Sequence, residues 1–190
     1  MASTILVDKI DPQSGTTLEI GSSGDTISFP SGTTISGSAT NTPAFFVTLT
    51  ASQTVSDNVK TKVTWTNEVY DTNSAFASDK FTVPSGQAGK YNFYLSVTCG
   101  TSGSWGVINA RAYIYKNGTS IYYFQGVKNE QGNDAFAVTG TLSLDLSDGD
   151  YIEVYGRNDN DAGTPSFLGK SGDSPNEERT WFGGYKVIGA

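Results

Sequence analysis

The sequence of 190 residues predicts an all-β protein, and three observations support this fold class. Apolar and polar residues alternate over positions 91–98, so that Tyr91, Phe93, Leu95 and Val97 share one face of an extended strand. Aromatic residues make up 12% of the chain and glycines number 22, which suits short strands joined by tight turns. Stretches with a leucine-rich helical pattern are few, and we expect almost no helix.

The strand at 91–97 is predicted to be central in an antiparallel sandwich. A shorter strand precedes it and should end at Pro84, because proline cannot donate a hydrogen bond to a sheet. Gly86 and Gly89 supply the backbone freedom for the intervening turn. Alternation and turn residues predict further strands at 43–49, 63–66, 68–71, 110–116, 120–124, 135–146 and 151–157.

Two of the predicted connections are tight turns. Asn117-Gly118 lies between 110–116 and 120–124, where this dipeptide favours a type I′ hairpin turn. Asp148-Gly149-Asp150 joins the last two predicted strands.

Sequence motifs near both ends of the region 43–189 resemble a known family. Asp79-Lys80-Phe81-Thr82, Pro84 and then Gly-Lys-Tyr-Asn-Phe at 89–93 resemble the complement-type globular head and its tumour-necrosis-factor-like relatives. The aromatic-glycine-aromatic run at 181–185 resembles the closing strand of the same family. The resemblance implies that residues 42–190 form a jelly-roll head that assembles as a homotrimer.

Residues 1–41 differ in composition and are expected to form a separate β-repeat arm. The segments 14–20, 23–29 and 31–37 share the pattern Ser-Gly-x-Thr-aliphatic, and each carries too few apolar side chains to bury a core alone. Three copies side by side would form a trimeric shaft. The alternative is a disordered Ser/Gly-rich linker. The expected shaft contacts are Leu18, Ile20, Ile27, Phe29 and Ile35.

The first residues are predicted to form an anchor. The apolar residues of the strand at 4–10 have no expected partner in their own chain and should add to another protein's sheet. They are Ile5, Leu6, Val7 and Ile10. This opening resembles that of small structural proteins of tailed bacteriophages, which implies a capsid or tail protein as the partner.

Composition excludes several function classes. The net charge is −7 and the basic residues form no cluster, which argues against nucleic acid. With no histidine and the single Cys99, the chain lacks a histidine-based nucleophile pair, a disulfide and a thiolate zinc site, and we expect no cofactor. We expect neither a signal peptide nor membrane insertion, and hence synthesis in the host cytoplasm.

Several residues are candidates for contact with other molecules. Tyr94, Tyr113 and Tyr115 lie at positions facing away from the core and are candidates for the trimer interface in the head; the alternative is that they lie on a solvated sheet. Residues 158–179 are expected to form a long loop. The receptor-binding candidates are Trp105, Asp159, Asp161 and Phe167. The run 159–163 resembles only the front half of a calcium loop.

These observations predict a non-enzymatic homotrimer on a bacteriophage virion surface, either a capsid decoration or head fibre, or a tail fibre. Its head would bind a host-surface glycan or protein. The first alternative is a stand-alone complement-like or lectin-like module. A glycan hydrolase is the second, and it would need a buried pair of carboxyl groups that the sequence does not offer.

Overall fold

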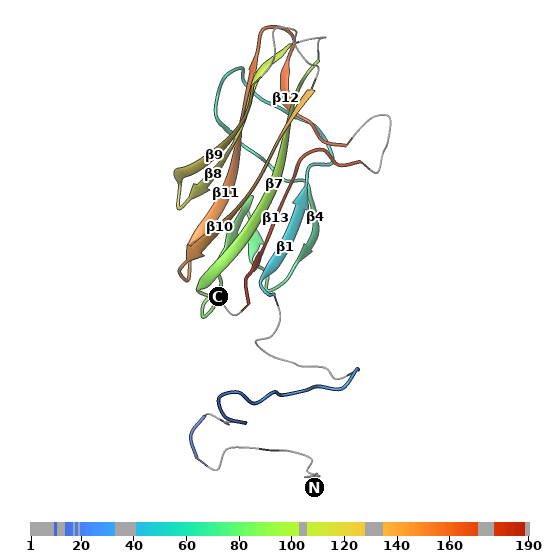
Figure 1. The fold of residues 1–190 in the computed structure, drawn as a ribbon. Coiled ribbons are helices and arrows are strands. Elements are labelled where there is room, and N and C mark those ends of the chain that lie inside the picture. Colours follow the sequence, from blue (N-terminus) through green and yellow to red (C-terminus); the bar gives the residue numbers. More distant parts are fainter. Residues whose placement is uncertain are drawn as a thin grey trace. The chain divides into compact units, whose positions relative to one another are not determined.

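The computed structural model describes residues 10, 14–16, 18, 20–32, 41–102, 106–127, 135–170 and 177–188. The chain divides into two compact units, Met1–Ser38 and Ala39–Ala190. The second unit is a sandwich of two antiparallel β-sheets (Figure 1). The described residues contain no helix, and therefore no helix that could span a membrane.

The first sheet, sheet A, is built around β7 (Gly89–Thr101). Its hydrogen-bonded order is β2 (Gln53–Thr54), β12 (Pro165–Phe167), β7, β13 (Trp181–Lys186), β1 (Ala44–Thr48) and β4 (Asn67–Asp71). The long strand β10 (Ala135–Leu146) pairs with the remaining edge of β7. The prediction of a central strand at 91–97 is confirmed.

The second sheet, sheet B, is built around β11 (Tyr151–Asn160). Its order is β5 (Phe76–Ala77), β6 (Lys80–Thr82), β11, β8 (Val107–Lys116) and β9 (Thr119–Val127), and β3 (Thr61–Lys62) also pairs with β11. Asn117 and Gly118 connect β8 to β9 with φ values of 52° and 77°. Positive φ at both positions is the type I′ geometry predicted for this dipeptide.

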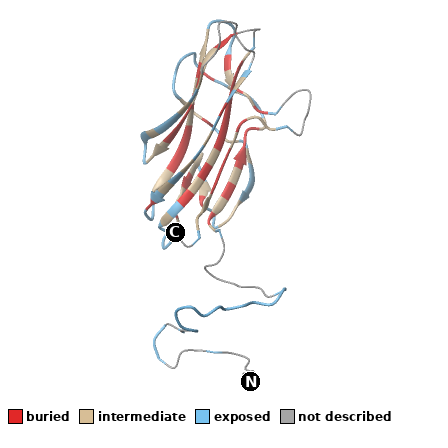
Figure 2. Cartoon of the chain, in the orientation of Figure 1, coloured by how far each residue is buried: buried red, intermediate tan, exposed pale blue. Residues whose placement is uncertain are grey.

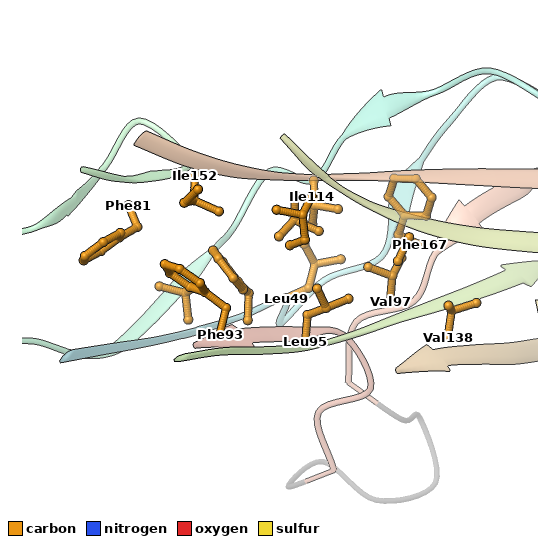
Figure 3. Close-up of a cluster of buried hydrophobic side chains, with 14 of the residues drawn as sticks. Leu49, Phe81, Phe93, Leu95, Val97, Ile114, Val138, Ile152 and Phe167 are labelled. Atoms are coloured by element: carbon orange, nitrogen blue, oxygen red, sulfur yellow. The ribbon is translucent and has the colours of Figure 1, made fainter. Parts of the chain in front are cut away.

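The core lies between the sheets and is rich in aromatic rings (Figures 2 and 3). The alternating residues of β7 from Tyr91 to Val97 are fully buried, as their pattern predicts. Phe45 lies 4.9 Å from Phe81 and 4.9 Å from Phe182, measured between ring centroids. These contacts join β1, β6 and β13 across the two sheets.

Two predicted segments differ in the structure. Residues 63–66 are not a strand, because the ladder with β11 ends at Lys62 and the chain then crosses to sheet A. The expected loop at 158–179 is partly ordered into the sheets: β11 continues to Asn160, and β12 pairs with both β7 and β2.

The closing strand β13 contains two adjacent glycines that each lie opposite an aromatic residue of β7. Gly184 pairs with Phe93 on the core side, and Gly183 pairs with Tyr94 on the outer side. A Cβ atom at either glycine would come within 2.6 Å of the paired ring. The missing side chains therefore let one ring lie on each face of the same strand.

At the end of the head where β1 begins, the β10–β11 turn binds two other turns. The carboxylate of Asp148 accepts backbone N–H groups of Gly86, Gln87 and Ala88, which lowers its pKa. The carboxylate of Asp150 accepts hydrogen bonds from Lys116 and Asn117 of the β8–β9 hairpin. Together with the backbone N–H of Ser147, they lower its pKa to about 2. The two carboxylates thus connect three turns at this end of the head: 84–88, the β8–β9 hairpin turn and the β10–β11 turn.

Acidification should therefore destabilise the head in a defined range. The folded-state pKa of Asp150 lies below its ordinary value of 3.8, so its stabilisation is present above about pH 4 and is lost as the pH falls through about 2. Asp150→Asn should lower stability at neutral pH and weaken the pH dependence in this range. Thermal unfolding followed by circular dichroism at a series of pH values measures both effects. Asp145→Asn controls for the change in net charge, and equal pH profiles for Asp150→Asn and the wild type would contradict the assignment.

The described residues of the arm form no β-strand. A hydrogen bond closes its turn at 22–25: the backbone N–H of Asp25 donates to the carbonyl oxygen of Ser22 at 3.0 Å. Its apolar side chains are 43–60% exposed: Ile10, Leu18, Ile20, Ile27 and Phe29. Ile5, Leu6, Val7 and Ile35 lie outside the described residues, and the shaft and the anchor remain predictions.

Candidate interaction surfaces

Four aromatic side chains form a cluster on the outer face of sheet A. Phe46, Tyr70, Tyr94 and Trp181 come from β1, β4, β7 and β13, and we refer to them as the outer aromatic cluster. Their neighbours along the strands, such as Phe45, Phe93 and Phe182, point into the core. Since side chains alternate between the two faces of a sheet, the cluster faces away from the core.

The four rings contact one another closely. The centroid of Phe46 lies 6.2 Å from those of Tyr70 and Tyr94 and 6.3 Å from that of Trp181. The hydroxyl oxygens of Tyr70 and Tyr94 are 3.2 Å apart. Burial, followed by the hydrogen bond and the proximity of Tyr70, raises the pKa of Tyr94 well above its usual value. The Tyr94 hydroxyl therefore stays neutral at physiological pH.

The outer aromatic cluster is only partly covered within one chain. Tyr70 is 44% exposed, and the other three rings are half-buried. Tyrosine and tryptophan are enriched at protein interfaces because a large apolar ring carries one polar group. The cluster has the chemistry of a subunit contact.

Tyr113 and Tyr115 do not join Tyr94, because they lie on the outer face of sheet B. Tyr113 is only 3% exposed, and the ammonium group of Lys60 lies 4.5 Å from the centre of its ring. Tyr115 stacks on Tyr155 with a centroid distance of 4.1 Å. Tyr94 therefore lies on a different outer face from Tyr113 and Tyr115, and the role of all three in a trimer interface stays a prediction.

The end of the head away from the start of β1 is formed by the β7–β8 and β11–β12 connections, which we call the distal loops. The hydroxyl of Thr101 donates to the carbonyl of Ala162 at 2.8 Å, and the N–H of Thr164 donates to the hydroxyl of Ser102 at 3.0 Å. Asp161 is exposed, and its N–H donates to the carbonyl of Gly106. These bonds hold segments from distant parts of the chain side by side.

Asp159 and Asp161 both lie at this distal end, and their contact with a receptor stays a prediction. Asp159 is half-buried beside the guanidinium of Arg157, at 3.5 Å. Sequence reasoning missed Asn158, whose buried amide donates to the carbonyls of Gly100 and Ser166. Trp105 lies outside the described residues.

Phe167 is not a surface residue. Its side chain is 0% exposed and belongs to the core. A Cβ atom at Gly156 would come within 2.3 Å of its ring, so this glycine of β11 provides the space for it. The prediction that Phe167 contacts a receptor is wrong, because the sandwich interior encloses it (Figure 3).

Acidic side chains and the thiol form no metal-binding group in the described part of the chain. No group of three histidine, cysteine, aspartate or glutamate residues there could hold a metal ion. The buried carboxylate of Glu153 lies 2.8 Å from the ammonium group of Lys62. Cys99 is fully buried, and burial raises the pKa of its thiol to about 12.

Comparison with solved structures identifies the fold. The globular domain of the zebrafish complement 1qA protein superposes with a TM-score of 0.50 at 17% identity, over 76% of this chain and 97% of that domain. Murine APRIL at pH 5.0 gives a TM-score of 0.52 at 15% identity, over 76% and 98% of the two chains. No family model and no curated protein sequence matches. The predicted complement-type and tumour-necrosis-factor-like jelly roll is confirmed as the fold.

Proposed function

We propose that the protein is a non-enzymatic homotrimer on the surface of a bacteriophage virion, attached by its arm and binding a host-surface glycan or protein through its head. The outer aromatic cluster carries the trimer part of this proposal. Its rings form a continuous patch that remains partly open to solvent in one chain. Association of three heads would remove this apolar area from water.

The exposed apolar residues of the arm support a shaft. Ile20, Ile27 and Phe29 are each more than half exposed in the single chain. Three arms aligned in register would bury these side chains against one another. The arm's resemblance to the opening of phage structural proteins supports the virion as the site of attachment.

The two ends of the head differ in what they can contact. The chain enters the head at β1 and leaves it after β13, and these strands pair at Ala44 and Tyr185. The distal loops lie at the opposite end of the sandwich (Figure 1). Asp159 and Asp161 therefore lie at the end of the sandwich away from the point where the chain enters the head.

Sedimentation velocity of the full chain tests the trimer. A stable trimer at micromolar concentration is expected, and a monomer under the same conditions would overturn the proposal. Co-sedimentation with purified virus particles distinguishes a virion protein from a free-standing binding module. Only a virion protein is expected to sediment with the particle.

Removal of residues 1–13 should separate assembly from attachment. The truncated protein lacks the anchor strand but keeps the repeats and the head, so it should fold and remain trimeric. It should fail to join the particle, which a comparison of purified virions by mass spectrometry measures. Incorporation at the full-length level would assign attachment to the head instead.

A further inference from the structure

The outer face of sheet B gathers positive charge on a chain whose net charge is −7. Tyr113 of β8 alternates with the buried Ala112 and Ile114, so Tyr113 and its register partners Tyr123 and Tyr155 point outwards. Five of the chain's 12 basic residues lie against this face: Lys60, Lys62, Lys80, Arg111 and Arg157. They are dispersed in the sequence, and folding brings them to one side of the head.

Two of these cations and two tyrosine rings form a continuous group, which we call the cationic tyrosine cluster. The ammonium nitrogen of Lys60 lies 4.5 Å from the centre of the Tyr113 ring. The ring centroids of Tyr113 and Tyr123 are 6.0 Å apart, and the guanidinium carbon of Arg111 lies 5.6 Å from the centre of the Tyr123 ring. Lys60 is exposed and Tyr123 is 60% exposed, so a ligand from solvent can reach both.

The charges of Lys60 and Arg111 are not neutralised within the described ranges of the chain. Neither side chain there lies within ion-pair distance of a carboxylate. The carboxylates that β11 carries on the same face are paired with other cations, at 2.8 Å in Lys62–Glu153 and 3.5 Å in Arg157–Asp159. The cluster therefore offers positive charge to an external anion.

Cations beside an exposed ring favour one class of ligand. A small inorganic anion would pair with the cations but leave the Tyr123 ring in water. A neutral sugar would cover the ring with its C–H face and leave the cations unused. An acidic peptide would find only side chains, because the main-chain groups of β8 already pair with β9 and β11. A sugar ring that carries an acidic group uses both the ring and the charge.

We propose that the cationic tyrosine cluster binds an anionic sugar unit of an acidic glycan. The sugar ring stacks on Tyr123, and its acidic group pairs with Lys60 or with the terminal nitrogens of Arg111. The Nε atom of Arg111 is buried and makes no contact with the ligand. This assignment deepens the proposed function and rests on its claim that the head binds a surface ligand. It adds a contact surface on the side of the head to the distal loops.

Four small probes test the sugar ring and the charge separately on the full-length protein. Sodium glucuronate and glucose 6-phosphate carry both features, methyl β-glucopyranoside carries only the ring, and sodium acetate carries only the charge. Titrations followed by saturation-transfer NMR should show saturable binding of at least one acidic sugar. The two single-feature probes should bind about tenfold more weakly or not at all. The acidic sugar that binds identifies the anionic group as a carboxylate or a phosphate.

Variants at exposed positions test the assigned contacts with the acidic sugar that binds. Lys60→Gln should weaken binding about fivefold, because it removes a charge-assisted contact, whereas Lys60→Arg keeps the charge and should bind like the wild type. Tyr123→Ala should also weaken binding about fivefold. It leaves the charge unchanged, so general attraction of anions cannot account for its effect. Lys90→Gln, at an exposed lysine of β7 in the other sheet, is the matched control and should bind like the wild type.

Several results would overturn the proposal. Failure of both acidic sugars to bind would do so, as would equal affinity for acetate or for the neutral glycoside. Equal losses in Lys60→Gln and Lys90→Gln would reduce the effect to net charge, and unchanged affinity in Tyr123→Ala would leave an anion site without a sugar. Binding of hexaglutamate but of neither acidic sugar would reassign the face to an acidic peptide.

The outcome can be separated from that of the proposed function. Sedimentation velocity and co-sedimentation with particles decide the trimer and the virion, and neither measurement depends on Lys60 or Tyr123. A trimeric virion protein that binds no acidic sugar would refute only the glycan site. A protein that binds glucuronate through these residues but does not sediment with particles would keep the site and lose the virion.

Discussion

Tyr94→Asp is expected to convert the proposed trimer into folded monomers. Tyr94 contacts Phe46 and Trp181 and shares a hydroxyl contact with Tyr70, so its replacement removes a ring that contacts all the other members of the outer aromatic cluster. An interface would also have to desolvate the new carboxylate, which costs several kcal/mol. A loss of about 3 kcal/mol corresponds to a more than 100-fold weaker association. Sedimentation equilibrium over a range of protomer concentrations measures it.

Tyr123→Asp is the matched control on the opposite side of the sandwich. Tyr123 is 60% exposed on β9 and lies 6.0 Å from the ring of Tyr113. The same chemical change there should leave the trimer intact. If Tyr123→Asp dissociates the trimer while Tyr94→Asp does not, the interface lies on sheet B, the side on which the predicted interface residues Tyr113 and Tyr115 lie.

Gly184→Ala should cause the largest loss of stability among single-methyl additions in β13. Its Cβ atom would come within 2.6 Å of the Phe93 ring and 3.0 Å of the carbonyl oxygen of Asn92. Phe93 is fully buried among other rings and has no space to withdraw. Overpacking of this kind costs about 1–3 kcal/mol. Thermal unfolding at a fixed protomer concentration measures the loss.

Gly183→Ala provides the comparison on the other face of the same strand. Its Cβ atom would meet the outer end of the half-buried Tyr94 ring, also at 2.6 Å. This ring can move toward solvent, so the unfolding temperature of the isolated head should change less than in Gly184→Ala. Association should weaken instead, because the outer aromatic cluster is displaced. Equal loss of stability in the two variants would contradict this separation of the faces.

Local sequence patterns were sufficient to predict the main strands and their inner faces. The alternation around Phe93 depends on a period of two residues, which any extended strand with one buried face must show. Asn117-Gly118 predicted its turn because few other pairs tolerate positive φ at both positions. The motifs at 79–93 and 181–185 indicated the jelly roll that the solved structures confirm.

The outward faces could not be assigned in the same way. Tyr94 and Tyr113 occupy equivalent positions in their own strands, yet β7 belongs to sheet A and β8 to sheet B. Alternation tells which residues face away from the core but not which strands become neighbours. The partners Phe46, Tyr70 and Trp181 reach Tyr94 through pairing between segments distant in sequence.

Phe167 shows the same limit at the core. It lies within a segment rich in glycine, serine and aspartate, and β12 is only three residues long, too short for a readable period. It is buried because β12 pairs with β7 and because Gly156 of β11 leaves space for its ring. The cationic tyrosine cluster likewise exists only because Lys60 lies over a ring of the distant strand β8.

The sequence by itself determined the all-β class, the inward alternation of the long strands, the turn chemistry and the lack of histidine for catalysis. These properties follow from residue types and spacings within a few positions of one another. The tertiary structure alone decided which outward-facing tyrosines share a surface, which loop residue is enclosed and which cations lie beside tyrosine rings. Those outcomes depend on the order of strands in each sheet and on the close approach of aromatic rings to glycines of other strands. Both are set by contacts between distant segments of the chain.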